Sequence, residues 1–173
     1  MDGINVIELE LQYSNTDRFV KRTLIFLRYS LQGIKIALRE NYDVIFATST
    51  PLTVGIPGIF AKLFRKKPFI FEVRDLWPEL PKAMGVITNP IILKLMDWLE
   101  TITYRAATAC IGLSPGIVEG IKKKIPDKDV SMIPNGCDLN LFDNKPKLKH
   151  EKIFTAVFTG GHGFANGLDA VLD

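Results

Sequence analysis

The chain has 173 residues, of which 47% are hydrophobic and 24% are charged, and its mean hydropathy is +0.13. This composition predicts a globular protein with enough apolar material for one ordinary domain, and it excludes a disordered chain. The net charge of +3 is modest. Because the basic residues are not interleaved with aromatic ones, we expect no nucleic-acid partner.

The basic residues gather in two clusters, at positions 62–67 and 122–124. The preferred interpretation is that both clusters lie in solvent at the carboxyl ends of helices, where cations are favoured. Attraction to an anionic membrane surface is the alternative, because clustered basic residues gain about 1 kcal/mol each there. The chain shows no secretory leader and no apolar run near the ~20 residues that cross a bilayer. Any membrane contact should therefore be peripheral. Because the only cysteines are Cys110, in an apolar run, and Cys137, in a turn, we expect a reduced, cytosolic protein.

Short apolar runs alternate with segments of helical periodicity along the chain. Strands are expected at residues 4–13, 43–47, 69–71, 109–113, 130–133 and 153–158. Helices are expected at residues 19–38, 52–64, 89–104, 114–124 and 166–172, the second of them kinked and buried. This alternation predicts right-handed crossovers and a largely parallel α/β sheet.

The most informative stretch follows the apolar run Phe69–Phe71. In open α/β sheets, ligands bind outside the carboxyl ends of the strands, so side chains in the next loop are well placed for a polar substrate. They are Arg74, Asp75, Trp77 and Glu79.

Each of these side chains also has a purely structural interpretation. Arg74 can pair with Asp75 or Glu79 and merely stabilise the loop, and the residues alone leave the functional and structural interpretations even. A single indole such as Trp77 more often packs in a core or loop than stacks on a ligand, so packing is slightly favoured.

A second junction between a strand and a helix lies at Thr48-Ser49-Thr50-Pro51. Helix amino ends present unpaired N–H groups that attract anions, so Thr48 and Ser49 are candidate substrate-binding residues. Plain helix capping explains them equally well.

The carboxyl-terminal part of the chain contains two turn sequences. Asn135 and Gly136 tolerate positive φ and predict a turn, and the polar, basic residues 143–152 predict a linker. Gly160 and Gly161 follow an apolar run, and their backbone N–H groups can approach a phosphate, although an ordinary turn is equally compatible. Without a cluster rich in His or Cys, we expect no metal site.

Three stretches resemble the motifs of family 4 retaining glycosyltransferases, in the family's order. Residues 71–79, FEVRDLWPE, resemble the strand and loop of the family's acceptor domain. Residues 133–138, IPNGCD, resemble its interdomain segment, and residues 158–169, FTGGHGFANGLD, resemble the opening of its donor domain. The resemblance covers residues 3–173 and is nearest to bacterial enzymes of O-antigen, capsule and exopolysaccharide assembly, such as the fucosamine transferases.

This resemblance implies an incomplete Rossmann-like acceptor domain of the GT-B type over residues 1–142. A linker at 143–152 and the first strand and helix start of a donor domain at 153–173 would follow. The implied reaction moves a sugar from a nucleotide sugar to a lipid-linked or polysaccharide acceptor, with no cofactor and no obligatory metal.

The resemblance also implies roles for single residues. Asp75 would contact or deprotonate an acceptor hydroxyl, and Arg74 stands where many relatives have His, so it suits an anionic acceptor group or diphosphate instead. The donor diphosphate would be held by Gly160, Gly161 and Asn166, and the interdomain segment would contribute Asn135, Gly136 and Asp138.

Compared with the family, the chain lacks elements at both ends, so we expect it to be inactive alone. One alternative is a non-catalytic acceptor-binding or membrane-docking subunit that works with a separately encoded donor domain. A second is a sugar-nucleotide epimerase of the same architecture.

Overall fold

The computed structural model describes residues 3–12, 14, 19–142, 157–160, 168 and 170. The chain divides into two compact units, residues 1–134 and residues 135–173. The sheet and the long helices belong to the first unit. The domain and linker boundaries inferred from the sequence, at residues 142 and 152, stay predictions.

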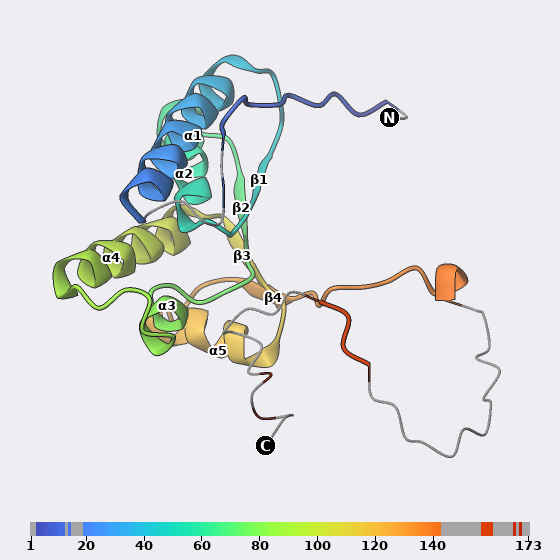
Figure 1. The fold of residues 1–173 in the computed structure, drawn as a ribbon. Helices are drawn as coiled ribbons and strands as arrows, with labels where there is room; N and C mark the ends of the chain where they lie inside the picture. The colour runs from blue at the N-terminus through green and yellow to red at the C-terminus, as the bar shows by residue number, and fades with distance from the viewer. Residues whose placement is uncertain are drawn as a thin grey trace. The chain divides into compact units, whose positions relative to one another are not determined.

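The described part of the first unit is built on a four-stranded parallel sheet with the strand order β1-β2-β3-β4 (Figure 1). Its strands are β1 (Ile45–Thr48), β2 (Phe69–Val73), β3 (Ala109–Gly112) and β4 (Val130–Met132). The register aligns Ala47 with Phe71, and Phe71 with Cys110. The parallel α/β architecture predicted from the sequence is therefore confirmed.

Helices precede, connect and follow these strands. The α-helices are α1 (Phe19–Arg39), α2 (Gly55–Arg65), α3 (Glu79–Ala83), α4 (Pro90–Ala106) and α5 (Pro115–Lys124). Short 3₁₀ helices cover Leu52–Val54 (η1) and Leu139–Phe142 (η2).

Two of these helices begin as the sequence predicts, with a capping side chain and Pro at the first helical position. The Asn89 Oδ1 atom accepts hydrogen bonds from the backbone N–H groups of Ile91 and Ile92 at the start of α4. At the start of α5, the Ser114 hydroxyl accepts one from the Ile117 N–H. These caps fix where the chain turns back after β2 and β3.

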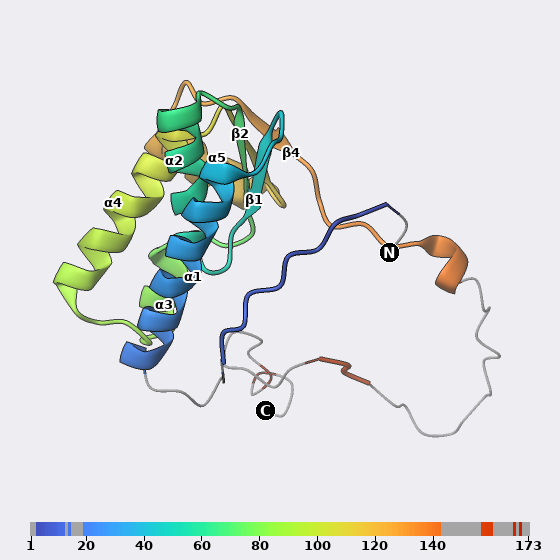
Figure 2. The ribbon, with the colours of Figure 1, turned by 90° about the horizontal axis from the view of Figure 1, so that it is seen from above.

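The connecting helices α2, α4 and α5 gather on one face of the sheet (Figures 1 and 2). This follows from the topology, because right-handed crossovers between strands added in one direction place their helices on the same side. The fully buried core lies on this covered face. It consists of Phe69, Phe71, Val73, Tyr104, Ala107, Cys110 and Ile121.

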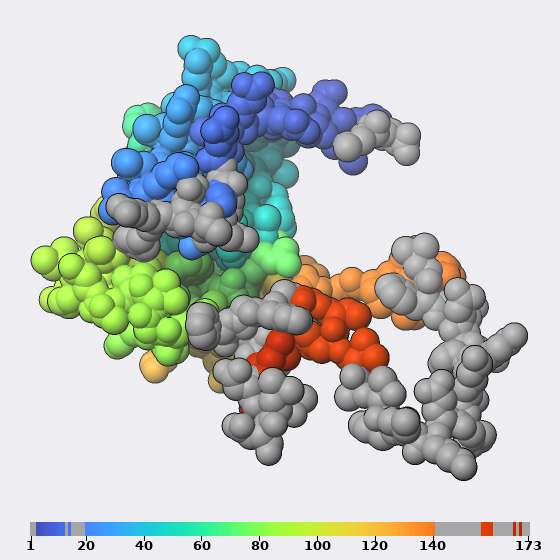
Figure 3. Space-filling view, in the orientation of Figure 1, coloured from blue at the N-terminus to red at the C-terminus, as the bar shows by residue number. Residues whose placement is uncertain are grey.

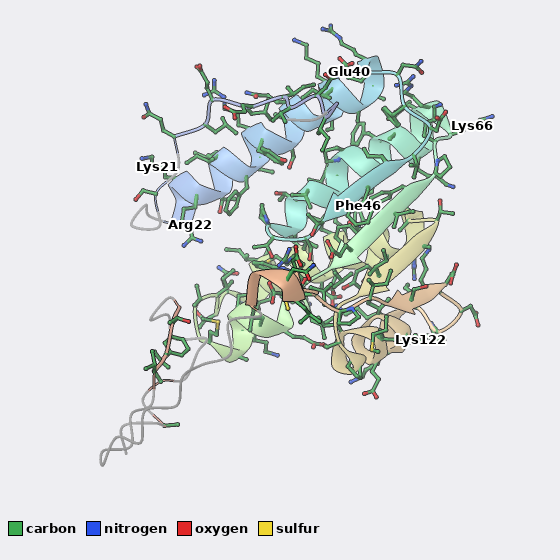
Figure 4. All side chains as sticks on the ribbon, turned by 90° about the vertical axis from the view of Figure 1, so that its right-hand side faces the viewer. Lys21, Arg22, Glu40, Phe46, Lys66 and Lys122 are labelled. Carbon is green, nitrogen blue, oxygen red and sulfur yellow. The ribbon has the colours of Figure 1, made fainter. Side chains whose placement is uncertain are left out.

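The opposite, open face carries the alternate residues of the same strands. They are Phe46, Thr48, Ile70, Glu72, Ala109, Ile111 and Ser131. Phe46, labelled in Figure 4, is 55% exposed, whereas Phe71 on the covered face is 0% exposed. The two faces therefore contribute unequally to the core.

Helix α1 packs on α2 rather than on the sheet. A Cβ atom at Gly33 would lie 2.8 Å from the Pro57 ring, so the two helices approach closely where only a glycine fits. The Ser30 hydroxyl donates to the carbonyl oxygen of Thr53 at 2.8 Å. This bond ties α1 to η1, directly after β1.

The strand predicted for Ile4–Tyr13 is wrong for this structure, since residues 4–12 form no strand. Ile4, Val6 and Ile7 are exposed. Alternation shows which side chains a neighbour can cover, but a strand also needs a partner for its backbone N–H and C=O groups. The pattern alone did not reveal whether that partner exists.

The kinked helix predicted for residues 52–64 is divided into η1 and α2. Pro57 lies in the first turn of α2, where its missing N–H group leaves no intrahelical bond unmade. The structure also adds α3, which was not predicted. Directly after the informative loop, it places Glu79 in its first turn.

Several predictions fall on residues outside the described ones. These are the linker 143–152, most of the helix 166–172, and residues 153–156 of the expected strand 153–158. Val157 and Phe158, which are described, form no strand. The donor-domain opening therefore stays a prediction.

Candidate functional site

The carboxyl ends of β1 and β2 are joined by Ser49. Its backbone N–H donates to the Glu72 carbonyl oxygen, and its hydroxyl accepts from the Arg74 N–H, each at 2.8 Å. Ser49 is 1% exposed, so the hydroxyl that sequence analysis offered as a substrate ligand is a buried bridge between the two loops. The structure thus shows a positioning contact, and any direct contact with substrate stays a prediction.

Beside this bridge, the structure brings Thr50 and Asp75 together. The Thr50 hydroxyl donates to the Asp75 carboxylate, with 3.1 Å between Thr50 Oγ1 and Asp75 Oδ2. Thr50 has a φ of 128°, a region that β-branched residues rarely adopt. Such strained residues persist only where their surroundings hold them, and they cluster at functional sites.

The exposed members of the predicted site are Thr48, Arg74 and Glu79. Among the described residues, Arg74 forms no ion pair with Asp75 or Glu79. The loop-stabilising pairing considered from the sequence is therefore not formed. Asp75 is half-buried, with one carboxylate oxygen bonded to Thr50.

Trp77 marks a different part of the same loop. Its backbone N–H donates to the Glu100 carboxylate at 2.8 Å, and its backbone carbonyl accepts from Lys124 Nζ at 3.2 Å. Trp77 is one of the residues that line a pocket beside α1 and α4, and its indole nitrogen is buried. The slightly favoured packing interpretation of Trp77 agrees with these contacts.

The loop is held by a buried polar network centred on Glu100. This carboxylate is 0% exposed and also accepts a hydrogen bond from the Tyr104 hydroxyl at 2.7 Å. Lys124 forms ion pairs with Glu100 and, at 2.8 Å, with Asp97. The network links α4, α5 and the loop after β2, so the Asp75 segment is fixed on both sides.

The pKa values in this network follow from its burial. Desolvation, reinforced by the charge and hydrogen bond of Glu100, raises the pKa of Tyr104 far above its usual range. Desolvation alone would lower the pKa of Lys124, but hydrogen bonds and attraction from Asp97 and Glu100 outweigh it and raise that pKa. Lys124 is therefore a structural cation.

The Glu100 network was not predicted from the sequence. Lys124 was assigned to a basic cluster at a helix end, yet its side chain is only 18% exposed. The available signal was a carboxylate among the apolar positions of α4, four residues before Tyr104, a spacing that places both on one helix face. A buried carboxylate requires a partner, which the exposed Lys122 and Lys123 are not placed to supply.

Four of the remaining predicted residues belong to the described part of the second unit. The Asp138 carboxylate accepts from the Asn140 N–H at 2.9 Å and so orders the start of η2. Asn135 and Gly136 are exposed, but the turn predicted there is wrong, since neither residue has a positive φ and the backbone forms no turn at these positions. A Cβ atom at Gly160 would lie 3.1 Å from the Phe158 ring. Gly161 and Asn166 lie outside the described residues.

Comparison with known proteins gives a match to Glycosyltransferase Family 4 over residues 5–141. This range covers more than half of the chain and contains the sheet, the Ser49 bridge and Asp75. The chain belongs to Glycosyltransferase Family 4.

A second similarity covers a smaller region. The chain is 32% identical over 87 residues to the exodeoxyribonuclease 7 large subunit of Brevibacillus brevis, which covers 43% of this chain and 19% of that protein. Because the chain spans about a fifth of its length, the similarity does not define a shared activity.

Within this glycosyltransferase family chain, the Asp75 region has the chemistry to recognise a hydroxyl. A half-buried carboxylate with one oxygen held by Thr50 presents its remaining acceptor positions to a ligand. The exposed guanidinium of Arg74 next to it suits phosphate or carboxylate groups. The arrangement fits a polar, hydroxyl-bearing molecule.

Proposed function

We propose that the first unit binds the acceptor in a glycosyl transfer reaction and that Asp75 receives the acceptor hydroxyl. The Thr50–Asp75 hydrogen bond carries this proposal, because it joins the ends of two neighbouring parallel strands. Ligands of open α/β sheets bind at this edge. Family membership supports the reaction class.

In the proposed reaction, the acceptor hydroxyl forms a bond to the anomeric carbon of the donor sugar. The bond from that carbon to the nucleoside diphosphate breaks, and the diphosphate leaves. Asp75 accepts the hydroxyl's hydrogen bond and can take its proton. Arg74 is placed to attract an anionic acceptor group or the leaving diphosphate.

The donor half of the proposal concerns the second unit. Gly160, Gly161 and Asn166 would meet the diphosphate of a nucleotide sugar, since glycine-rich turns let backbone N–H groups approach phosphate oxygens. The segment containing Asn135, Gly136 and Asp138 would connect the two halves. We propose no metal requirement and a hexosyl-type sugar in cell-surface glycan assembly.

We also propose that the first unit rests on a membrane surface. Exposed apolar residues recur along one side of α1 and of α4, which lie on the same side of the first unit (Figure 3). They are Val20, Leu24, Leu27 and Leu31 on α1, and Ile91, Leu95 and Trp98 on α4.

The charge on α1 supports this surface placement. Lys21, at the start of α1 in Figure 4, and Arg28 are exposed near the apolar residues, as in helices that lie in a lipid interface. Among the described residues, no helix is both long enough and apolar enough to cross a membrane.

Saturation-transfer NMR with short glycan acceptors and with UDP-, GDP- and dTDP-sugars tests the proposed function. We expect the intact chain to bind an acceptor glycan, and Asp75→Asn to weaken binding about tenfold because a charge-assisted hydrogen bond is lost. Asp43→Asn is the matched control, since this exposed carboxylate precedes β1, at the opposite end of that strand.

Two results would overturn the proposal. One is acceptor binding that Asp75→Asn leaves unchanged while the far-ultraviolet circular dichroism shows an intact fold. The other is epimerisation of a nucleotide sugar by the intact chain with no transfer to any hydroxyl acceptor.

A further inference from the structure

Thr50, which follows the carboxyl end of β1, has an unusual backbone conformation for its residue type. Its φ of 128° lies in a region that glycine adopts readily and that residues with a Cβ atom disfavour. The position therefore favours glycine on conformational grounds, yet it carries a hydroxyl that donates to Asp75. Because such strain concentrates at ligand-binding sites, a role of this hydroxyl in binding is the first explanation to test.

Toward a ligand, the Thr50–Asp75 pair offers hydrogen-bond acceptors. The Thr50 hydroxyl uses its hydrogen to reach Asp75 Oδ2, so in this arrangement its oxygen can only accept a further hydrogen bond. An ionised carboxylate also only accepts, and one hydrogen bond leaves it further acceptor positions. Thr50 is exposed and Asp75 is half-buried, so a ligand in solvent can reach both side chains. The pair therefore selects a ligand that donates two hydrogen bonds from neighbouring points.

The spacing of the two acceptors indicates which donors fit them. Thr50 Oγ1 and Asp75 Oδ2 are 3.1 Å apart. Hydroxyl oxygens on adjacent carbons of a sugar ring are separated by a similar distance when they are gauche to each other, so each can donate to one member of the pair. Equatorial hydroxyls on non-adjacent ring carbons lie much farther apart. The spacing therefore favours two adjacent hydroxyls.

We propose that Thr50 and Asp75 together bind two adjacent hydroxyls of the acceptor sugar, the reacting one at Asp75 and its neighbour at Thr50. This inference rests on the proposed function. It narrows the acceptor to sugars with a free hydroxyl beside the position that is glycosylated. No bond is made or broken at Thr50, whose role is to determine which of the two hydroxyls meets Asp75.

Removing hydroxyls from the ligand and from the chain in turn tests this arrangement. Saturation-transfer NMR first gives the Kd values for the methyl glycosides of glucose, galactose and mannose, and then for each monodeoxy form of the glycoside that binds most tightly. We expect Thr50→Val, which keeps the side-chain shape but loses the hydroxyl, to weaken binding of this parent glycoside about fivefold. It should leave unchanged the affinity for the monodeoxy form that lacks the hydroxyl facing Thr50.

Asp75→Asn identifies the second hydroxyl in the same way. Its effect should vanish for a different monodeoxy form, and the two hydroxyls identified by the two variants should lie on adjacent ring carbons. A purely structural role for Thr50 would instead make Thr50→Val weaken the parent and every monodeoxy form by the same factor. That result overturns the inference, and so does a pair of hydroxyls on non-adjacent carbons.

Three further variants separate the hydroxyl from the fold. Thr50→Ser keeps the hydroxyl and should retain the affinity for the parent glycoside. Thr50→Gly removes both the hydroxyl and the strain, so it should weaken binding as Thr50→Val does, yet unfold at an equal or higher urea concentration. Thr101→Val is the matched control on α4, where it removes a hydroxyl that donates to the Asp97 carbonyl oxygen, and it should leave binding unchanged.

The outcomes distinguish this inference from the proposed function. If no glycoside binds the unsubstituted chain, the proposed function fails and this inference fails with it. If a glycoside binds and Asp75→Asn weakens its binding, while folded Thr50→Gly keeps full affinity, the inference alone is overturned.

Discussion

The two faces of the sheet are made by alternate residues of the same short strands, yet their surroundings differ sharply. On the covered face, Phe69, Phe71 and Cys110 are fully buried beneath α2, α4 and α5. On the open face, Phe46 and Thr48 are exposed. The comparison shows that the core forms on the face that the connecting helices cover.

The covered face also controls the candidate site. The helices that bury Phe71 and Val73 bring Glu100 and Lys124 to the loop after β2. That loop in turn fixes the position of Asp75. Stability on one face and the geometry of the carboxyl edge are therefore coupled through Glu100 and Lys124.

The largest expected difference between the two faces is in the free energy of unfolding when a phenylalanine on each face is replaced by alanine. We expect Phe71→Ala to lower the free energy of unfolding by about 3–5 kcal/mol, because it leaves a cavity in the core. Phe46→Ala should change it by less than about 1 kcal/mol, because little apolar area is lost from a half-exposed site. Urea denaturation followed by circular dichroism measures both.

The same pair can break the comparison. If Phe46→Ala costs as much as Phe71→Ala, the open face is covered in solution. Dimerisation detected by sedimentation would then show that a second copy of the chain covers this face. If neither substitution matters, the core assignment itself is wrong.

The sequence was sufficient for the sheet because short apolar runs and helix caps are local signals. Asn89 and Ser114 mark helix starts through bonds to residues two or three positions away. The strand predicted at residues 4–13 was wrong for the opposite reason, since a strand depends on a distant partner. Alternation of apolar residues carries no information about that partner.

A second difference concerns lysines on one helix. Lys124→Met should lower the free energy of unfolding by about 2 kcal/mol, because Glu100 is then buried without its cation. Lys122→Met, on the exposed side of α5, should change it by less than about 0.5 kcal/mol. Equal effects of the two variants in urea denaturation would show that the Glu100 network adds nothing to stability.

The same network makes the free energy of unfolding depend on pH, and the direction of that dependence follows from the pKa shifts. The pKa values of Lys124 and Tyr104 are raised in the folded state. The stability they contribute is present below their unfolded pKa values, about 10 for both groups, and is lost as pH rises further. The difference between the unsubstituted chain and Lys124→Met should therefore narrow above about pH 10.

The candidate site was only partly accessible from the sequence. Arg74, Asp75 and Ser49 were found because they directly follow apolar runs, which places them at one sheet edge. The contact between Thr50 and Asp75 spans 25 positions, and the Lys124–Glu100 ion pair spans 24. Such contacts depend on how strands and helices pack, and no local pattern encodes them.

The smallest expected difference in the free energy of unfolding is between substitutions at two adjacent residues at the end of β1. Ser49→Ala removes the acceptor of the Arg74 N–H, and leaving that part-buried donor unpaired should cost about 1 kcal/mol. Thr48→Ala, on the open face, should cost less than about 0.5 kcal/mol. Denaturant titration resolves this difference in the free energy of unfolding if both variants unfold with the same dependence of that free energy on denaturant concentration.

Acceptor binding distinguishes positioning from direct contact at these two residues. If Ser49 acts only by holding Arg74, Ser49→Ala should weaken acceptor binding modestly, and Ser49→Thr should restore it by supplying the hydroxyl again. If Thr48 contacts the acceptor, Thr48→Ala should weaken binding without changing stability. A Ser49→Ala variant with normal stability but no acceptor binding would instead place the Ser49 hydroxyl against the substrate, against its burial in the structure.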